Sequence, residues 1–254
     1  MYPYINIFGL MLPSYGICMT VGFFLTALLV VKKAAKNNII FEDVVIVAAS
    51  VLIGTIIGGG LLYIFTTFSL SQIWEFITHG EFSFLFSGLV FYGGLVGGIV
   101  GGIVSAKLLK LNIGVLAKCI VPFIPFGHAI GRIGCLLAGC CYGFRYDGIF
   151  SVRLIDSVTG EVGNFFPVQI VEAVLDIVIM FILLKLSSKG RQGYTLLSIY
   201  LVLYAVMRFG LEFLRGDAIR GSYLFLSTSQ WISVAIILVI LVVFAVKFIR
   251  YRRT

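Results

Sequence analysis

The sequence predicts an all-α integral membrane protein in which seven transmembrane helices form a bundle. Its 254 residues are 60% hydrophobic and only 12% charged, whereas soluble domains are about 45–50% apolar and about 25% charged. The mean hydropathy is +1.11. Apolar stretches of about 20 residues, the length that crosses a bilayer, recur along the chain. This composition excludes a soluble globular enzyme and, because disorder requires low hydrophobicity and high charge, a disordered chain.

Seven stretches bounded by charged residues, proline or asparagine have the length of a membrane span. They are residues 15–31, 44–65, 86–108, 115–140, 167–186, 194–213 and 229–248. The first is expected to be a retained helix rather than a cleaved signal peptide, because Lys32 and Lys33 follow the apolar run instead of preceding it. The spans are expected to form a single polytopic membrane domain over residues 1–254.

The basic residues predict the orientation of the spans. Thirteen of the 19 lie on one side, in or beside the connections that follow the first, third, fifth and seventh spans. Only Arg145, Arg153, Arg215 and Arg220 lie on the opposite side. Because basic residues remain in the cytoplasm, the N-terminus is expected outside and the C-terminus inside. The net charge of +8 is therefore a topology signal, and no nucleic-acid partner is expected.

Two external connections, residues 66–85 and 142–166, are long enough to form small external segments. In the second, Val-Arg-Leu at 152–154 and Thr-Gly-Glu at 159–161 predict short strands joined by a turn. The internal connections are short and basic. The chemistry of the protein is therefore expected to open toward the outer leaflet.

Polar side chains at helical spacing share one face of the fifth span and one face of the sixth. They are Gln169, Glu172 and Asp176 in the fifth and Arg208, Glu212 and Arg215 in the sixth. An ionisable group inside the bilayer costs at least about 2.5–3.5 kcal/mol, so it normally faces the bundle interior. For Gln169 and Glu172, structural hydrogen bonding and a functional role both remain open.

The arginines allow two interpretations. In the first, Arg208 and Glu212 form an internal ion pair that holds helices in register. In the second, the guanidinium forks of Arg132, Arg208 and Arg215, which outnumber the nearby carboxylates, bind a phosphate such as that of a phospholipid head group. Glycine-rich stretches at 58–60 and 93–102 are expected to let helix backbones approach closely.

The most concentrated motif is residues 127–143, GHAIGRIGCLLAGCCYG, at the outer end of the fourth span. Its glycines are expected to break the helix near the membrane surface and to place Arg132 in a glycine-framed turn. Together with Pro-Phe-Ile-Pro-Phe-Gly at 122–127, the motif resembles the signature of the prolipoprotein diacylglyceryl transferases. That signature is Pro-x-x-Pro-Phe-Gly, then Gly-Arg-x-Gly-Asn, a short spacer, Gly-Glu and a closing glycine.

The resemblance extends over nearly the whole chain. Five further segments are similar to family motifs and occur in the same order. They are Tyr15-Gly16 with Gly22-Phe23, Tyr92-Gly93-Gly94-Leu95, Pro167-Val168-Gln169-Ile170-Val171-Glu172, the stretch from Arg208 to Arg215 with Glu212 between them, and Ser229-Gln230. Each motif alone is weak, but the ordered set is specific.

The resemblance implies an enzyme of the bacterial cytoplasmic membrane with its active site toward the outer leaflet. Such an enzyme moves the diacylglyceryl group of phosphatidylglycerol to a lipobox cysteine thiol in a secreted precursor protein and leaves glycerol phosphate. The residues placed in catalysis are Arg132, Arg208, Glu212, Tyr15, Cys140, Cys135 and Tyr92. Those placed in substrate binding are Arg215, Gln169, Glu172, Gly134, Gly143, His128 and Gln230. No metal and no nucleotide cofactor is expected.

The chain departs from the family pattern at four polar positions. Cys135 stands where the family has the motif Asn, Cys140 where it has the motif Glu, Tyr92 where it has His, and Gly60 where it has Arg. Two candidate general bases, the motif carboxylate and the His, are therefore absent from this sequence. The ionisable groups that remain are Glu212 and His128, the latter interpreted either as a base or as a satisfied core histidine.

The three cysteines of the motif leave several interpretations open. A thiol at Cys135, Cys140 or Cys141 acts as a nucleophile or acceptor, with its thiolate favoured by Arg132. Alternatively, Cys135 and Cys140 form a disulfide, which requires that Gly139 break the helix.

Two further interpretations are a metal site and simple packing. A metal site would join the cysteines to His128, although Cys-x4-Cys-Cys is not a standard zinc pattern. As small buried hydrophobes the cysteines would only pack, which is the interpretation that fits Cys18 and Cys119. Two alternative functions follow: a diverged homologue that acts on another acceptor or uses the thiols as carriers or in redox chemistry, and a non-catalytic lipid-binding or transport protein.

Overall fold

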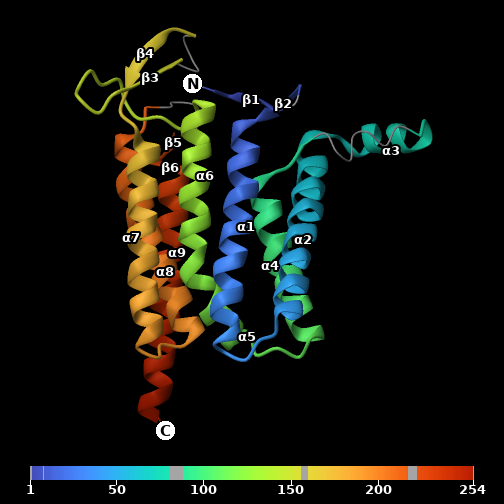
Figure 1. Ribbon diagram of the computed structural model, residues 1–254, viewed down its shortest axis with the longest axis vertical. Coiled ribbons are helices and arrows are strands. Elements are labelled where there is room, and N and C mark those ends of the chain that lie inside the picture. The colour runs from blue at the N-terminus through green and yellow to red at the C-terminus, as the bar shows by residue number, and fades with distance from the viewer. Residues whose placement is uncertain (1, 8, 81–87, 156–159, 217–221, 254) are drawn as a thin grey trace. The chain divides into compact units, whose positions relative to one another are not determined.

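The computed structural model describes residues 2–7, 9–80, 88–155, 160–216 and 222–253, most of which are helical (Figure 1). The helices are α1 (Ser14–Ala35), α2 (Phe41–Thr67), α3 (Leu70–Thr78), α4 (Phe91–Leu108), α5 (Ile113–Ile120), α6 (Ile124–Ala138), α7 (Val168–Ser188), α8 (Gly193–Leu211) and α9 (Thr228–Arg253). Antiparallel hairpins pair β1 (Tyr4–Ile7) with β2 (Leu10–Pro13), β3 (Val152–Ile155) with β4 (Val162–Phe165), and β5 (Ser222–Tyr223) with β6 (Leu226–Ser227). Three predicted features lie outside the described residues: the helix start at Phe86, the first residue of the turn at 159–161, and Arg220.

Each predicted span contains a helix. Among the described residues, six helical segments are long and apolar enough to cross a membrane, and the stretch from α5 to α6 is one of them. The helix α7, in the fifth predicted span, is not among these six. It has 21 residues and carries the charged side chains Glu172, Asp176 and Lys185. The predicted class, an all-α protein that crosses the membrane several times, is therefore confirmed. The count of seven spans and their orientation stay predictions.

The predicted fourth span is not one continuous helix. A 3₁₀ turn, η2 (Val121–Phe123), separates α5 from α6. Pro122 and Pro125 lie at this break, where each removes a backbone donor from the helix. The prolines, and not the glycines of the motif, therefore interrupt the span.

One glycine of the motif ends α6, and two others do not interrupt it. The helix continues through Gly131 and Gly134 and ends where Gly139 adopts a left-handed φ of 75°. A Cβ at Gly134 would lie 2.8 Å from the Cβ of Cys18, so this glycine allows α1 to pack closely against α6. Arg132 consequently lies on a regular helix, and the predicted glycine-framed turn around it is wrong.

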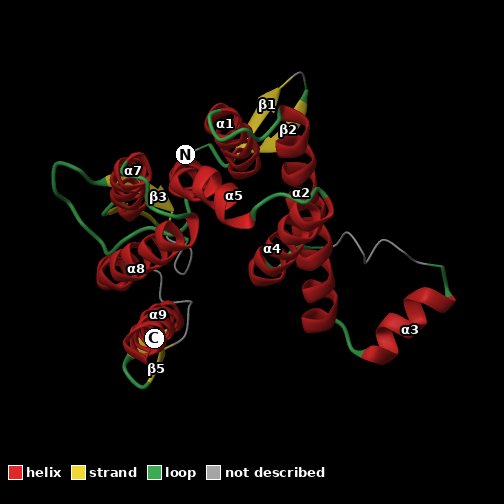
Figure 2. Cartoon of the chain, turned by 90° about the horizontal axis from the view of Figure 1, so that it is seen from below, coloured by secondary structure: helices red, strands yellow, loops and turns green. Residues whose placement is uncertain are grey.

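The chain divides into two compact units, residues 1–29 with 117–254, and residues 30–116. In the unit of residues 30–116, α2 and α4 lie side by side (Figure 2). A Cβ at Gly97 would lie 2.1 Å from the carbonyl oxygen of Gly54, and one at Gly58 would lie 2.3 Å from that of Gly93. The two backbones therefore meet only because these positions are glycine, as the sequence predicted.

In the other unit, α6 packs against α7, and α8 packs against both α7 and α9 (Figure 1). Val121, Ile179, Leu183 and Leu196 form a buried core there. The β3–β4 hairpin lies beyond the end of α6 and confirms the strands predicted in residues 142–166. The β1–β2 hairpin was not predicted.

Candidate functional site

Two contacts to buried carboxylates join α6 to α7, an ion pair made by Arg132 and a contact made by His128. Arg132 Nη2 lies 2.9 Å from Glu172 Oε1, and His128 Nδ1 lies 3.2 Å from Asp176 Oδ2. The pairs are one helical turn apart on each helix and run in opposite directions along the two, so α6 and α7 are antiparallel here. Glu172 and Asp176 are 1% and 0% exposed, respectively. Carboxylates buried this deeply require such partners.

A further ion pair lies within α8 and the turn that follows it. Arg208 pairs with Glu212, and its Nη2 donates a hydrogen bond to Ser229 Oγ at 3.2 Å. Arg208 also lies within electrostatic reach of Glu172 and Arg215. The internal ion pair considered from the sequence is therefore present. The predicted excess of guanidinium over carboxylate is smaller than expected, because Glu172 and Glu212 each hold one arginine.

The paired arginines still have donors available. Among the described residues, Arg132 Nε and Arg208 Nη1 are buried and have no hydrogen-bond partner. A buried donor left unsatisfied costs about 1–3 kcal/mol. An anion that accepts hydrogen bonds from both groups would remove this cost, and phosphate oxygens match guanidinium donors well. The arrangement is therefore suited to binding a phosphate.

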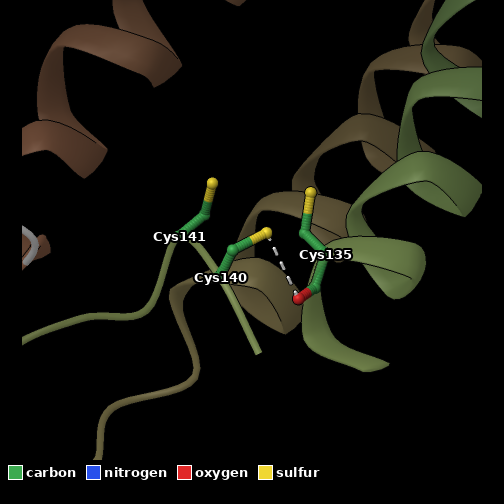
Figure 3. Close-up of side chains that lie close together, drawn as sticks. All are labelled: Cys135, Cys140 and Cys141. Atoms are coloured by element: carbon green, nitrogen blue, oxygen red, sulfur yellow. Dashed lines mark hydrogen bonds between the residues drawn. The ribbon is translucent and has the colours of Figure 1, made fainter. Parts of the chain in front are cut away.

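The cysteines of the motif come together at the end of α6. The sulfur atoms of Cys135, Cys140 and Cys141 all lie within 4.8 Å of one another (Figure 3). The left-handed turn at Gly139 reverses the chain, so that the Cys140 N–H donates to the Cys135 carbonyl at 3.0 Å. Figure 3 also shows the Cys140 thiol directed at this carbonyl, 3.7 Å away. No disulfide joins the five cysteines, all of which lie in the described ranges.

The surroundings of Cys141 stabilise its thiolate. The pKa of Cys141 lies below its ordinary value because the neighbouring thiols of Cys135 and Cys140 and, to a smaller extent, the guanidinium of Arg215 favour the charged sulfur. Cys141 itself adopts a φ of 64°, which is unusual for a residue with a side chain. Three sulfur ligands can hold a thiophilic metal here. His128, which the alternative metal site considered from the sequence included, is not part of this cluster and lies beside Asp176 instead.

Other predicted site residues support the loop that carries the thiols. Gln169 Nε2 donates to the Cys140 carbonyl at 2.7 Å. The Gly143 N–H donates to the Phe166 carbonyl at 2.9 Å, and a Cβ at Gly143 would lie 2.7 Å from that oxygen. These two residues therefore position the cysteines, whatever else they contact.

Gln230 caps a helix. Its Oε1 accepts from the Ser227 N–H at 2.9 Å, while its own N–H donates to Ser227 Oγ at 3.2 Å. This reciprocal arrangement is a capping box at the start of α9. The role of Gln230 in substrate binding stays a prediction.

Tyr15 and Tyr92 differ in where they lie. Tyr15, on α1, is within electrostatic reach of Cys135 and Arg132. Tyr92 lies on α4, in the unit of residues 30–116, and its place in the site stays a prediction.

Tyr204 is a site residue that was not predicted from the sequence. Its ring centroid lies 5.2 Å from that of His128, and its hydroxyl is within electrostatic reach of Glu172 and Arg132. The signal was available, because Tyr200, Tyr204 and Arg208 recur at four-residue intervals on α8 and therefore share one face. Asp176 was noted from its spacing but not placed in the site.

Comparison with known proteins shows the family of this chain. The sequence model of a family described as prolipoprotein diacylglyceryl transferase matches residues 3–246. A phosphatidylglycerol–prolipoprotein diacylglyceryl transferase 2 of Clostridium perfringens is 31% identical over 234 residues, which cover 92% of this chain and 90% of the relative. A phosphatidylglycerol–prolipoprotein diacylglyceryl transferase of Clostridium tetani is 32% identical over 250 residues, 98% of this chain and 97% of the relative. This chain therefore belongs to the prolipoprotein diacylglyceryl transferase family.

Proposed function

We propose that this protein transfers the diacylglyceryl group of phosphatidylglycerol to a cysteine thiol of a secreted lipoprotein precursor. The observation that carries the proposal is the match to this family over nearly the whole chain. The buried arginine pairs support it, because they provide a binding site for the anionic part of the lipid. The enzyme lies in the cytoplasmic membrane with its N-terminus outside, its C-terminus in the cytoplasm and its active site toward the outer leaflet.

Arg132 and Arg208 bind the phosphate of the lipid. Glu172 and Glu212 hold the two guanidinium groups in place, while Arg132 Nε and Arg208 Nη1 are the donors that remain for the phosphate oxygens. Because these donors are buried and already oriented, their hydrogen bonds strengthen as negative charge develops on the departing phosphate. Arg215, within electrostatic reach of Arg208, adds to the positive field.

The reaction is a displacement at a glyceryl carbon. The acceptor sulfur attacks the CH₂ group that carries the phosphate oxygen, and a carbon–sulfur bond forms while the carbon–oxygen bond breaks. The electron pair of the broken bond leaves on the phosphate oxygen, so glycerol phosphate departs and the acceptor carries a thioether. The thiol proton needs an acceptor, and Glu212 is a carboxylate beside the phosphate-binding Arg208. Tyr15 lies near Arg132 and completes the polar lining.

Purified protein in phosphatidylglycerol vesicles, incubated with a lipobox peptide, tests this proposal. We expect the peptide to gain the mass of a diacylglyceryl group, and a peptide with serine in place of the cysteine to gain none. No mass gain would refute the activity. Binding of the lipid head group without transfer would favour the lipid-binding alternative. A gain of mass on a different acceptor would favour the diverged homologue.

A further inference from the structure

The cysteine cluster has the geometry of a metal site with one open position. Zinc bound at about 2.3 Å from each thiolate in a tetrahedron places the sulfur atoms about 3.8 Å apart. The three sulfur atoms here lie within 4.8 Å of one another, so they reach that geometry by moving about 1 Å or less. Cys135 is buried, whereas Cys140 is exposed, so the cluster is covered on one side only. Zinc sites with three protein ligands and an open side are typical of catalysis.

The residues around the cluster balance the charge of such a site. Three thiolates and Zn²⁺ carry a net charge of −1, which becomes −2 when a fourth thiolate binds. Arg215 lies within electrostatic reach of the sulfur of Cys141, and Arg132 lies within electrostatic reach of Cys135 and Cys141. Cationic donors to ligand sulfur atoms are the outer contacts that stabilise a thiolate-bound metal.

The loop holds the ligands in position without a metal. Gly139 is left-handed, Cys141 has a positive φ, and Gln169 fixes the carbonyl of Cys140 at 2.7 Å. A set of ligands ordered in advance loses less conformational entropy when the metal binds. This local order distinguishes the cluster from cysteines that merely pack.

The other interpretations of the thiols fit less well. A disulfide would use two of the three sulfur atoms and leave the third, and none is formed here. A carrier would become a thioether after accepting the diacylglyceryl group, and a thioether does not pass its alkyl group on under these conditions. A metal uses all three sulfur atoms at once.

We infer that Cys135, Cys140 and Cys141 bind zinc, and that the open fourth position takes the acceptor cysteine as its thiolate. This inference rests on the proposed function. Binding to the metal displaces the thiol proton to solvent, because a coordinating thiol is deprotonated outright. The bound sulfur then attacks the glyceryl carbon, glycerol phosphate leaves with the electron pair, and the thioether dissociates from zinc, which is neither oxidised nor reduced. With the metal bound, the acceptor thiol is deprotonated without Glu212 as the base, in a chain that lacks the motif carboxylate and the His of the family.

Metal content of the purified full-length protein tests the site without any lipid. We expect about one zinc per chain after growth with zinc, measured by elemental analysis and by competition with a chelator. Changing Cys135, Cys140 or Cys141 singly to Ser should weaken zinc affinity more than about 100-fold, because even outer contacts are worth 10- to 100-fold. Cys18→Ser is the matched control and should bind zinc as the unchanged protein does.

Wild-type protein that takes up no stoichiometric zinc overturns the inference, whether or not the variants fold. Equal affinity in Cys140→Ser and Cys18→Ser also overturns it. Because this readout requires no turnover, transfer by a zinc-free protein would refute the metal and leave the proposed function intact. Stoichiometric zinc without transfer would refute the proposed function and leave the metal site intact.

The fourth position is tested with Co²⁺ in place of zinc. The sulfur-to-cobalt charge-transfer absorption grows with the number of bound thiolates. The lipobox peptide should therefore raise it by about one third, as three thiolates become four. The peptide with serine in place of cysteine should leave it unchanged. No rise with the cysteine peptide would overturn the role of the metal in activating the acceptor.

Discussion

Replacing Arg132 by lysine keeps a positive charge beside Glu172 and removes the guanidinium fork. Arg132 Nη2 holds Glu172 at 2.9 Å, while Nε is buried with no hydrogen-bond partner in the described part of the chain. A lysine ammonium that pairs with the Glu172 carboxylate cannot also donate a hydrogen bond in the direction in which Arg132 Nε points. The lost contact is the one assigned to the phosphate. A hydrogen bond to a charged group is worth about 1.5–3 kcal/mol, so Arg132→Lys should lower kcat/KM roughly 10- to 150-fold.

The assay measures peptide modification in phosphatidylglycerol vesicles beside thermal unfolding in one detergent. The unfolding temperature of Arg132→Lys should stay near that of the unchanged protein, because Glu172 keeps a cation. Arg132→Met is the contrasting variant. It removes the ion-pair partner of a carboxylate that is 1% exposed, which should lower the free energy of unfolding by about 3–5 kcal/mol. Full turnover by Arg132→Lys would show that the fork does not bind the phosphate.

Three further predictions concern other parts of the chain. Arg208→Lys should also lower kcat/KM at least about 10-fold with an unchanged fold, and unaltered kinetics would leave Arg208 and Glu212 as a structural pair only. Gly97→Ala should destabilise the protein by about 1–3 kcal/mol in thermal unfolding, because its Cβ would meet the Gly54 carbonyl oxygen. Gly210→Ala is its control, since a Cβ there meets nothing within 4 Å, and equal stability of the two variants would contradict close packing of α2 and α4. Cys119→Ser should change neither transfer nor zinc content, because a helical serine satisfies its hydroxyl on a nearby carbonyl; lost zinc would place this cysteine among the ligands.

The helices were predictable from the sequence because run length and hydropathy are local properties. The break before α6 was also predictable, since Pro122 and Pro125 cannot lie in the interior of a regular helix without removing a backbone hydrogen bond. The prediction for Gly134 was wrong because a glycine in a membrane helix can either interrupt the helix or allow a second helix to pack closely against it. Only the packing of α1 against α6 decides between them.

The site was predictable as a set of residues but not as a set of partners. Arg208 and Glu212 are four residues apart, so their pairing follows from helical spacing. Arg132 and Glu172 are 40 positions apart in the sequence, and their pairing depends on how α6 and α7 dock. The thiol cluster depends on the single left-handed turn at Gly139, which sequence reasoning held open but did not decide.

The most direct test of the central claim is a mass balance on one reaction. The protein in vesicles of phosphatidylglycerol with a labelled head group is incubated with a lipobox peptide, and the peptide and the released glycerol phosphate are both quantified. Transfer of a diacylglyceryl group predicts equal amounts of modified peptide and glycerol phosphate, and a glyceryl group that stays on the peptide sulfur after hydroxylamine treatment because this link is a thioether. Modified peptide without glycerol phosphate, or a modification that hydroxylamine removes, would contradict displacement at the glyceryl carbon.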